Sequence, residues 1–194
     1  MSASLEEIVA ALSEDNNMLG LKHGINLLAD YDPEWPRAFA EERTRIHSAL
    51  GDAARGIEHY GSTAVEGLRA KPIIDILVGV APLEDWARCK RPLEELGYDY
   101  ADNASVPGHF VFGRGRDRSE RTHLVHVVEF NGESWRSNLA FRDALRADQS
   151  LRTEYLRTKE QAVVLVPEGR GGYNDLKHSF FKQIKRSLGG NQSA

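Results

Sequence analysis

The chain has 194 residues, 41% of them hydrophobic and 28% charged, which is enough to build the core of one globular domain. Its net charge of −4 argues against non-specific binding to duplex nucleic acid, and its single cysteine, Cys89, excludes an internal disulfide and fits a reducing compartment. Because no stretch approaches about 18 apolar residues and the N-terminus lacks a basic segment followed by an apolar one, we expect a cytoplasmic protein without a membrane span.

Residues 1–26 are expected to form a helix and a linker, separate from a domain at residues 27–194. Ser4 to Glu7 has the pattern of a helix start. Apolar residues then recur at helical spacing, at Leu5, Ile8, Val9 and Leu12. Residues 14–26 hold polar residues and two glycines, which indicates a linker. The helix is expected either to dock on the domain or to bind a partner.

In the domain, helices and strands alternate and a β-ribbon follows. The expected strands are Ile57–Tyr60, Pro72–Val80, His109–Gly113 and Thr122–Phe130. The expected helices are 31–50, Leu83–Leu96, Glu133–Arg146, Ser150–Val166 and Asn174–Leu188, with a kink or break at Pro92. Three arginines in the loop from Arg114 to Glu120 form either a solvated tip or a phosphate clamp. The fold class is α/β or α+β, with a small mixed sheet flanked by helices.

Between the first two strands, the residue types suit a bound nucleotide. The first strand ends at a turn of Gly61, Ser62 and Thr63, whose N–H groups and hydroxyls suit phosphate. Asp75 lies inside the second, apolar strand, and a carboxylate there either pairs with a cation or faces a cleft. A carboxylate beside a phosphate-binding turn suits Mg²⁺, so these residues provide what a nucleoside triphosphate needs. The alternatives are an ordinary turn with Ser62 as a helix cap, and a structural ion pair for Asp75.

Four short sequence segments together resemble the GrpB family of the polymerase-beta type nucleotidyltransferase superfamily. They are IEHYGSTAV (Ile57–Val65), KPIIDILV (Lys71–Val78), HLVHVVE (His123–Glu129) and LAFRDALRA (Leu139–Ala147). The resemblance runs from about Tyr31 to Phe181 and implies a nucleotidyltransferase-like fold with additional C-terminal helices. It implies an enzyme that uses Mg²⁺ to transfer a nucleotidyl group from ATP or another nucleoside triphosphate to a small-molecule or protein acceptor. It also implies a link to dephospho-CoA kinase, because GrpB-like domains are fused to that enzyme in some bacteria.

The sequence departs from the superfamily pattern at Leu77, where a second strand carboxylate is expected. Asp75 is the expected metal ligand and catalytic residue. Glu58 and His126 are candidates for the missing ligand, and both are included among the catalytic candidates. The alternatives are that Glu58 pairs with Lys71 or an arginine, and that His126 is a satisfied core histidine. On a strand, residues 75 and 77 share a face, so Leu77 is expected to line the cleft.

Further residues are expected around this centre. Lys71 and Arg121 are expected to neutralise phosphate charge, although Lys71 could instead pair with a carboxylate. His123 and Glu129 are weaker candidates, and Arg142 with Asp143 fits an ion pair between helix and core. The resemblance also points to an acceptor groove lined by Tyr155, Lys159, Tyr173 and Lys177.

Two other functions remain open from the sequence. The chain could be a nucleotide-binding module, of a kind related to coenzyme A, that lacks turnover because Leu77 removes a metal ligand. It could also be an interaction protein that works through its first helix. Metal-dependent nucleotide binding and pyrophosphate release distinguish these functions.

Overall fold

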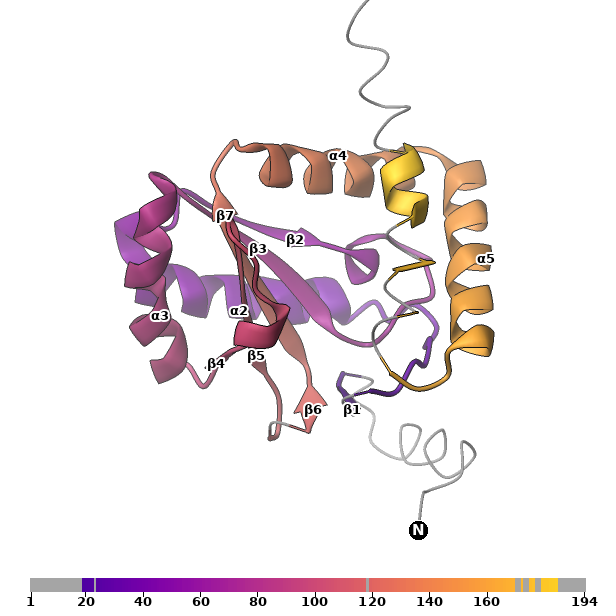
Figure 1. The fold of residues 1–194 in the computed structure, drawn as a ribbon, viewed down its shortest axis with the longest axis horizontal. Helices are drawn as coiled ribbons and strands as arrows, with labels where there is room; N and C mark the ends of the chain where they lie inside the picture. The colour runs from indigo at the N-terminus through magenta and orange to yellow at the C-terminus, as the bar shows by residue number, and fades with distance from the viewer. Residues whose placement is uncertain are drawn as a thin grey trace, which may run out of the picture.

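The computed structural model describes residues 19–22, 24–117, 119–169, 172, 175–176 and 179–184. Within these residues the main sheet has five strands in the order β2-β3-β7-β5-β4 (Figure 1). Their bounds are β2 Gly56–Tyr60, β3 Ile74–Val80, β4 Asp99–Tyr100, β5 His109–Arg114 and β7 His123–Glu129. β3 and β7 run parallel and the other neighbours run antiparallel, which confirms the predicted small mixed sheet.

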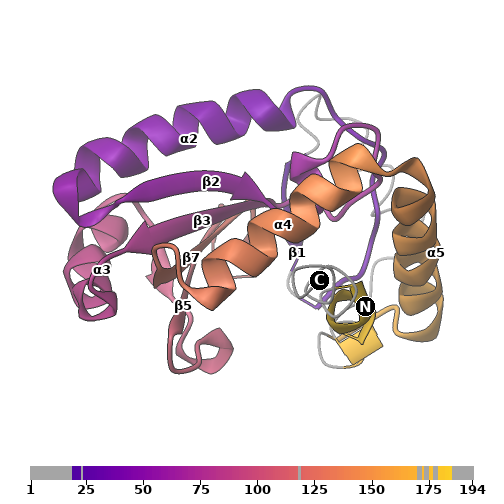
Figure 2. The same ribbon diagram turned by 90° about the horizontal axis from the view of Figure 1, so that it is seen from above.

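One face of the sheet carries the main hydrophobic core. Helices α2 (Trp35–Leu50) and α3 (Trp86–Glu95) pack on this face. Alternate residues of β3 point into it and are fully buried, namely Ile74, Ile76, Val78 and Val80. From α2 the core receives Trp35, Ile46 and Leu50, which recur at helical spacing on one face of the helix. Figure 2 shows α2 on one side of the sheet and α4 on the other.

The second face is covered by α4 (Glu133–Ala147), and α5 (Gln149–Leu165) stands beside it. Trp135 of α4 lies directly on two strand glycines. A Cβ added at Gly56 or Gly79 would come within 2.7 or 2.8 Å of its ring. These glycines therefore let α4 approach the sheet closely, over the end of β3 that is remote from Asp75.

The helix predicted at Leu83–Leu96 differs in one respect from the expectation. A turn of 3₁₀ helix at Leu83–Asp85 precedes α3, and α3 then continues through Pro92 without a break. Of the two alternatives at Pro92, the break is wrong and the kink stays a prediction; the buried side chains of Cys89 and Leu93 hold both halves of the helix on the core. Tertiary packing here outweighs the hydrogen bond that proline removes.

The described end of the expected linker is packed on the domain. Strand β1 (Leu21–Lys22) pairs antiparallel with β6 (Glu120–Arg121), and the Gly20 N–H donates to the Pro72 carbonyl over 2.8 Å. Asn26 is buried. Two-residue strands leave no periodic signal, so β1 and β6 cannot be recognised from the sequence pattern. The predicted first helix lies outside the described residues.

None of the described helices has the length and apolar character needed to cross a bilayer. The last described segment is helical at residues 179–184, within the helix expected at Asn174–Leu188, and Phe180 is buried there. Phe180 joins α4 and α5 to the segment after β2 through a second small core. Its buried members are Val65, Leu68, Leu145, Tyr155 and Phe180.

Candidate active site

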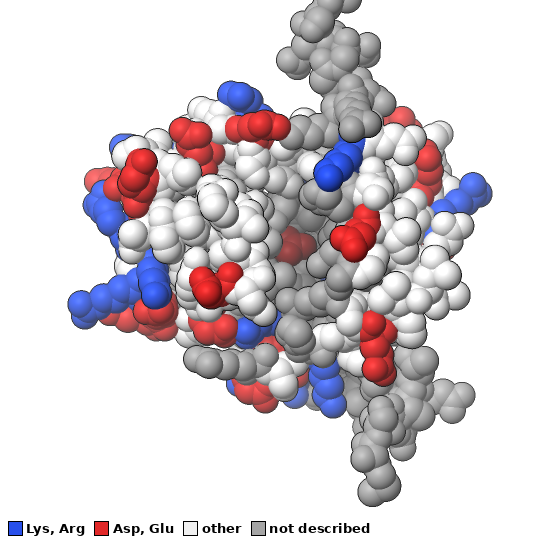
Figure 3. Space-filling model, viewed as in Figure 1, with Lys and Arg blue, Asp and Glu red and all other residues white. Residues whose placement is uncertain are grey.

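Strand register brings Asp75, Glu58 and His126 to one face of the sheet. Between β2 and β3, Tyr60 lies opposite Asp75 and Glu58 lies opposite Leu77. Between β3 and β7, His126 lies beside Leu77. Residues that pair across neighbouring strands project to the same side, so all five side chains share the face that carries α4. Figure 3 shows this side of the molecule hollowed near its centre, with acidic atoms in the hollow.

Gly61 lies in direct contact with the Asp75 carboxylate. Its backbone has φ +74°, and a Cβ placed there would come within 2.5 Å of Asp75 Oδ2. Glycine is required here both because the conformation is left-handed and because the carboxylate occupies the space. Ser62 begins the 3₁₀ turn η2 (Ser62–Ala64), so the turn and the carboxylate are adjacent, as the sequence predicts.

Thr63, also expected to contact phosphate, points into the core. It is buried, and its hydroxyl donates to the Ile73 carbonyl over 3.2 Å and lies 3.1 Å from His59 Nε2. The Thr63 side chain therefore fixes the turn against the start of β3. Its contribution to the site is the position that it gives to Gly61 and Ser62.

His126 connects Asp75 to a second histidine that sequence reasoning missed. His126 Nε2 lies 3.8 Å from Asp75 Oδ1, and His126 Nδ1 lies 2.8 Å from His109 Nε2. Ser134 Oγ of α4 lies 3.5 Å from His109 Nδ1. Burial, and then the neighbouring His126, lower the pKa of His109 to about 4, so His109 is neutral at pH 7. Only the antiparallel register of β5 on β7 brings His109 here, and no sequence motif reports that register.

Glu58 is held by an arginine of α4. Arg142 NH1 lies 2.8 Å from Glu58 Oε2 and donates to the His59 carbonyl, while Arg142 Nε lies 2.8 Å from Asp143 Oδ1. The structure thus shows the arginine partner that the sequence left open for Glu58, and the helix-to-core ion pair expected for Arg142. Glu58 shares the face of Asp75 but is engaged in fastening α4 to β2.

Leu77 does not line an open cleft, which corrects the expectation from strand periodicity. It shares the face of Asp75, yet it is 0% exposed and packs with Val128 and Trp135. Periodicity assigns a residue to a face, but it does not tell which part of that face a helix covers. Asp75, whose side chain is 28% exposed, lies beyond the part that Trp135 covers.

Lys71 and Arg121 each form a polar contact with another side chain. Lys71 Nζ donates to Asn26 Oδ1. Arg121 is 8% exposed and forms two hydrogen bonds, of 2.9 and 2.7 Å, with the two oxygens of Asp99. The structure therefore places Arg121 in a buried ion pair, where Asp99 neutralises the charge that was expected to meet phosphate.

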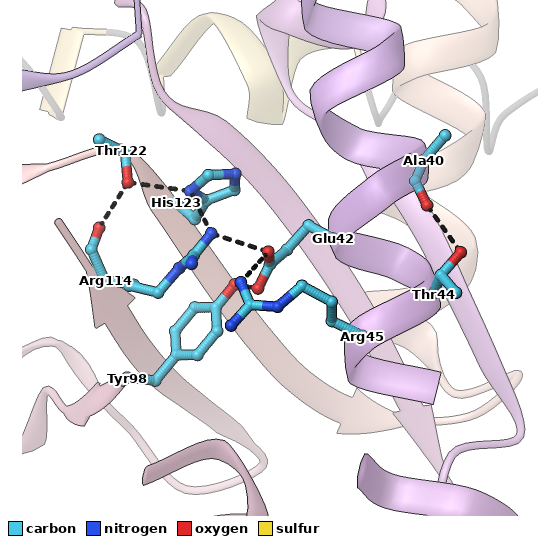
Figure 4. Close-up of polar contacts among 8 residues, drawn as sticks. All are labelled: Ala40, Glu42, Thr44, Arg45, Tyr98, Arg114, Thr122 and His123. Atoms are coloured by element: carbon cyan, nitrogen blue, oxygen red, sulfur yellow. Dashed lines mark hydrogen bonds and ion pairs between the residues drawn. The ribbon is translucent and has the colours of Figure 1, made fainter. Parts of the chain in front are cut away.

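His123 and Arg114 belong to a buried polar cluster on the opposite face of the sheet (Figure 4). Arg114 NH2 lies 2.7 Å from Glu42 Oε2 of α2 and 3.2 Å from His123 Nδ1. Burial and the positive charges of Arg114 and Arg45 lower the pKa of His123 to about 3. His123 therefore lies on the other face of the sheet from Asp75. Arg114 ends β5, and its guanidinium contacts Glu42 and His123. Arg118 lies outside the described residues.

Two of the four residues expected to line an acceptor groove can be placed. Tyr155 and Lys159 are buried, and Lys159 Nζ donates to the Arg69 carbonyl, while Tyr173 and Lys177 lie outside the described residues. A cavity of about 570 Å³ opens beside η2. Its lining residues are Tyr31, Pro36, Ala64, Val65, Glu66, Arg146 and Arg152.

Few side chains near Asp75 could act as metal ligands. Among the residues that the structure describes, no three His, Cys, Asp or Glu side chains converge on one point. Glu129, a weaker candidate, is exposed at the end of β7. A metal ion here would therefore depend on Asp75, one neighbour and oxygens from substrate or water, which is a usual arrangement for Mg²⁺.

Comparison with known proteins relates the chain to one family. The family model described as "GrpB protein" matches residues 26–187. The chain is 34% identical over 174 residues to the glutamate-rich protein GrpB of Alkalihalophilus pseudofirmus, covering 88% of this chain and 100% of that protein. The crystal structure of the conserved protein GrpB from Enterococcus faecalis superimposes with a TM-score of 0.73 at 32% identity, covering 83% of this chain and 96% of that one.

Two more distant matches are a solved structure with a similar fold and an enzyme that is longer than this chain. The structure of the GLD-2/RNP-8 complex matches with a TM-score of 0.54 at 11% identity, over 82% of this chain and 60% of that chain. At this identity the likeness shows the fold alone, which is nucleotidyltransferase-like. A dephospho-CoA kinase of Mycolicibacterium paratuberculosis is 28% identical over 179 residues, covering 80% of this chain and 44% of that protein.

Proposed function

Because the chain belongs to the GrpB family, we propose that it is a nucleotidyltransferase. It takes a nucleotidyl group from ATP or another nucleoside triphosphate, with Mg²⁺, and transfers it to a small-molecule or protein acceptor. The observation that carries this proposal is the contact between Gly61 and Asp75, which sets the turn of Gly61 and Ser62 against a partly exposed carboxylate. We place the reaction in the cytoplasm, in keeping with the free, buried Cys89.

The residues present fit a bound triphosphate and its ion. Asp75 would hold Mg²⁺, which, when bound, neutralises phosphate charge and polarises the reacting phosphorus. The Gly61 backbone and the Ser62 hydroxyl would bind phosphate oxygens beside that carboxylate. Transfer forms a bond between an acceptor oxygen and the α-phosphorus and breaks the bond to pyrophosphate, so the protein acts mainly by positioning the groups.

The cavity beside η2 is where an anionic group of the nucleotide donor or of the acceptor substrate would bind. Arg146 donates to the Ala64 carbonyl over 3.0 and 2.8 Å, and Arg152 donates to the carbonyls of Leu145 and Arg146. A carbonyl satisfies a guanidinium hydrogen without cancelling its charge. Arg146 also forms an ion pair with Asp143 (NH1 to Oδ1, 3.5 Å) and Glu66 lines the cavity, so the positive charge that suits phosphate or carboxylate comes mainly from Arg152.

A second candidate is a nucleotide-binding module with little turnover, related to coenzyme A metabolism. Two observations favour it: Leu77 is buried where a second carboxylate is usual, and Glu58 is paired with Arg142. The match to a dephospho-CoA kinase supports the relation to coenzyme A. Release of pyrophosphate in the presence of acceptors separates an enzyme from a binding module.

The test is titration of α,β-methylene-ATP with and without Mg²⁺. Wild type should bind the analogue in a Mg²⁺-dependent way. Asp75→Asn should lose that dependence and weaken binding by more than about tenfold. The matched control is Asp52→Asn, which removes an exposed carboxylate in the turn after α2 and should bind like wild type. Binding by Asp75→Asn that equals wild type, with both proteins folded, contradicts the assignment of the metal ligand.

A further inference from the structure

His126 Nε2 is a buried nitrogen for which the described residues provide no hydrogen-bond partner. The nearest charged atom is Asp75 Oδ1, at 3.8 Å, which is too long for a hydrogen bond. Buried polar atoms in proteins are nearly always satisfied, so an unsatisfied one beside a partly exposed carboxylate indicates a missing third participant. An atom placed between Nε2 and Oδ1 would satisfy both.

We propose that His126 Nε2 and Asp75 Oδ1 are ligands of the same metal ion, and that the imidazole makes the site prefer a first-row transition ion such as Co²⁺ or Zn²⁺ to Mg²⁺. The inference rests on the proposed function, because phosphate oxygens of the bound triphosphate complete the coordination. Imidazole binds such ions well, whereas Mg²⁺ favours oxygen ligands. The two ligand atoms need to approach by less than about 1 Å to bind one ion at the usual distances near 2.1 Å.

The neighbouring side chains explain why His126 takes this role. In the register of β3 and β7, His126 lies beside Leu77, the position at which a second carboxylate is usual. Leu77 is buried beneath Trp135, and Glu58 on the other neighbouring strand is held by Arg142. His126 therefore offers the ligand atom that Leu77 lacks, from the adjacent strand on the same face.

His109 and Ser134 act as positioning residues for this ligand. A histidine that binds a metal usually donates its other N–H to an acceptor, which fixes the ring and its tautomer. With the ion bound, His126 Nδ1–H donates to His109 Nε2, and His109 Nδ1–H donates to Ser134 Oγ, along the observed 2.8 and 3.5 Å contacts.

Without the ion, the same chain of hydrogen bonds runs in the opposite direction. Ser134 O–H then donates to His109 Nδ1, His109 Nε2–H donates to His126 Nδ1, and His126 Nε2–H faces the Asp75 carboxylate. The two directions differ in which ring nitrogen donates, so ion binding would reverse the direction of the chain. A serine hydroxyl can serve as donor or acceptor, which lets it end the chain in either direction.

The experiment is calorimetric titration of Co²⁺ and of Mg²⁺ into the protein saturated with α,β-methylene-ATP. His126→Ala should lower Co²⁺ affinity by more than about tenfold and leave Mg²⁺ affinity nearly unchanged. His109→Ala should lower Co²⁺ affinity by about tenfold, the lower end for a residue that orients a ligand. His109→Gln, whose amide oxygen can accept from His126 Nδ1–H, should recover part of that loss. His47→Ala, an exposed position of α2, is the matched control and should behave like wild type.

The outcomes separate this inference from the proposed function. If both ions bind with the nucleotide and the ratio of their affinities is the same in wild type and His126→Ala, the inference is overturned and the proposed function stands. If wild type binds neither ion with the analogue, both are overturned. Should His126→Ala fail to fold, His126→Gln replaces it. Its amide oxygen is a hard ligand, so it should lower the Co²⁺ preference, and an unchanged ratio would again overturn the inference.

Discussion

Gly61 and Asp75 touch so closely that a single added carbon at residue 61 would lie 2.5 Å from Asp75 Oδ2. Gly61→Ala should therefore displace the carboxylate as well as strain a backbone with φ +74°. We expect a loss of about 1–3 kcal/mol in unfolding free energy and a triphosphate affinity reduced by more than about tenfold. Urea denaturation and titration of α,β-methylene-ATP measure the two effects.

Gly67→Ala is the control for this prediction. Gly67 has φ +73°, and a Cβ there would meet no atom within 4 Å. It should lose stability through strain alone and keep its affinity for the nucleotide. If Gly61→Ala binds the analogue as well as Gly67→Ala does, the contact with Asp75 has no part in binding.

Restoring the second carboxylate at residue 77 should destabilise the protein. Leu77 is fully buried with Val128 and Trp135, so Leu77→Asp places an unpaired carboxylate in an apolar layer. We expect a loss of about 3 kcal/mol or more, while Leu77→Met, which conserves volume, should lose less than about 1.5 kcal/mol. Chemical denaturation measures both. A stable Leu77→Asp protein with tighter Mg²⁺ binding would show that residue 77 reaches the ion after all.

The pairing of Glu58 with Arg142 predicts that Glu58 is dispensable for binding. Its side chain is 42% exposed, so Glu58→Gln should change stability by less than about 1 kcal/mol. Arg142→Met should lose more, about 1.5–3 kcal/mol, because it also removes hydrogen bonds to His59 and Asp143. Nucleotide titration of Glu58→Gln should match wild type. A loss above tenfold would restore Glu58 as a ligand.

Stability should fall as the medium becomes acidic, in part through His123. Burial lowers the pKa of His123 from 6.5 to about 3, so between these values the unfolded chain binds a proton that the folded chain does not. The contribution of His123 to the free energy of unfolding is therefore complete above about pH 7. It is lost as pH falls, by up to about 1.4 kcal/mol per pH unit. Buried His59, whose pKa is lowered to about 4, acts in the same direction.

His123→Gln tests this expectation, because glutamine does not titrate. Thermal unfolding between pH 7 and pH 5 should show a smaller loss of melting temperature in the variant than in wild type. His47→Gln, at an exposed position, should follow wild type. Identical pH dependences in all three proteins would contradict the assignment to buried His123.

The boundary of the folded unit is expected to lie before residue 19. Removing residues 1–18 keeps every described contact, whereas removing residues 1–26 also takes away buried Leu21 and Asn26 and the pairing of β1 with β6. The longer deletion should therefore melt at a lower temperature than the shorter one, as scanning calorimetry can measure. Equal melting temperatures would show that this segment adds nothing to stability.

Local sequence patterns predict the long helices and strands, and they also predict that the Gly61 turn lies beside Asp75. The apolar strand around Asp75 and the Gly61 turn are local patterns, and local patterns report which residues neighbour one another along the chain. The roles of His109 and Arg142 depend on contacts with residues 17 and 84 positions away, at His126 and Glu58. Such contacts follow from strand register and helix placement, which a single sequence does not encode in any repeating pattern.

Asn26 forms hydrogen bonds with residues that are far apart in the sequence. Its amide donates to the Val166 carbonyl, 140 residues away, and to the Gly169 carbonyl, while its oxygen accepts from Lys71. A contact of such long range forms late, because the loop that it closes is large. On the ribosome, Asn26 leaves the exit tunnel early and has to wait until Val166 has been synthesised. The last part of the domain to settle is therefore expected to be among the first to be made.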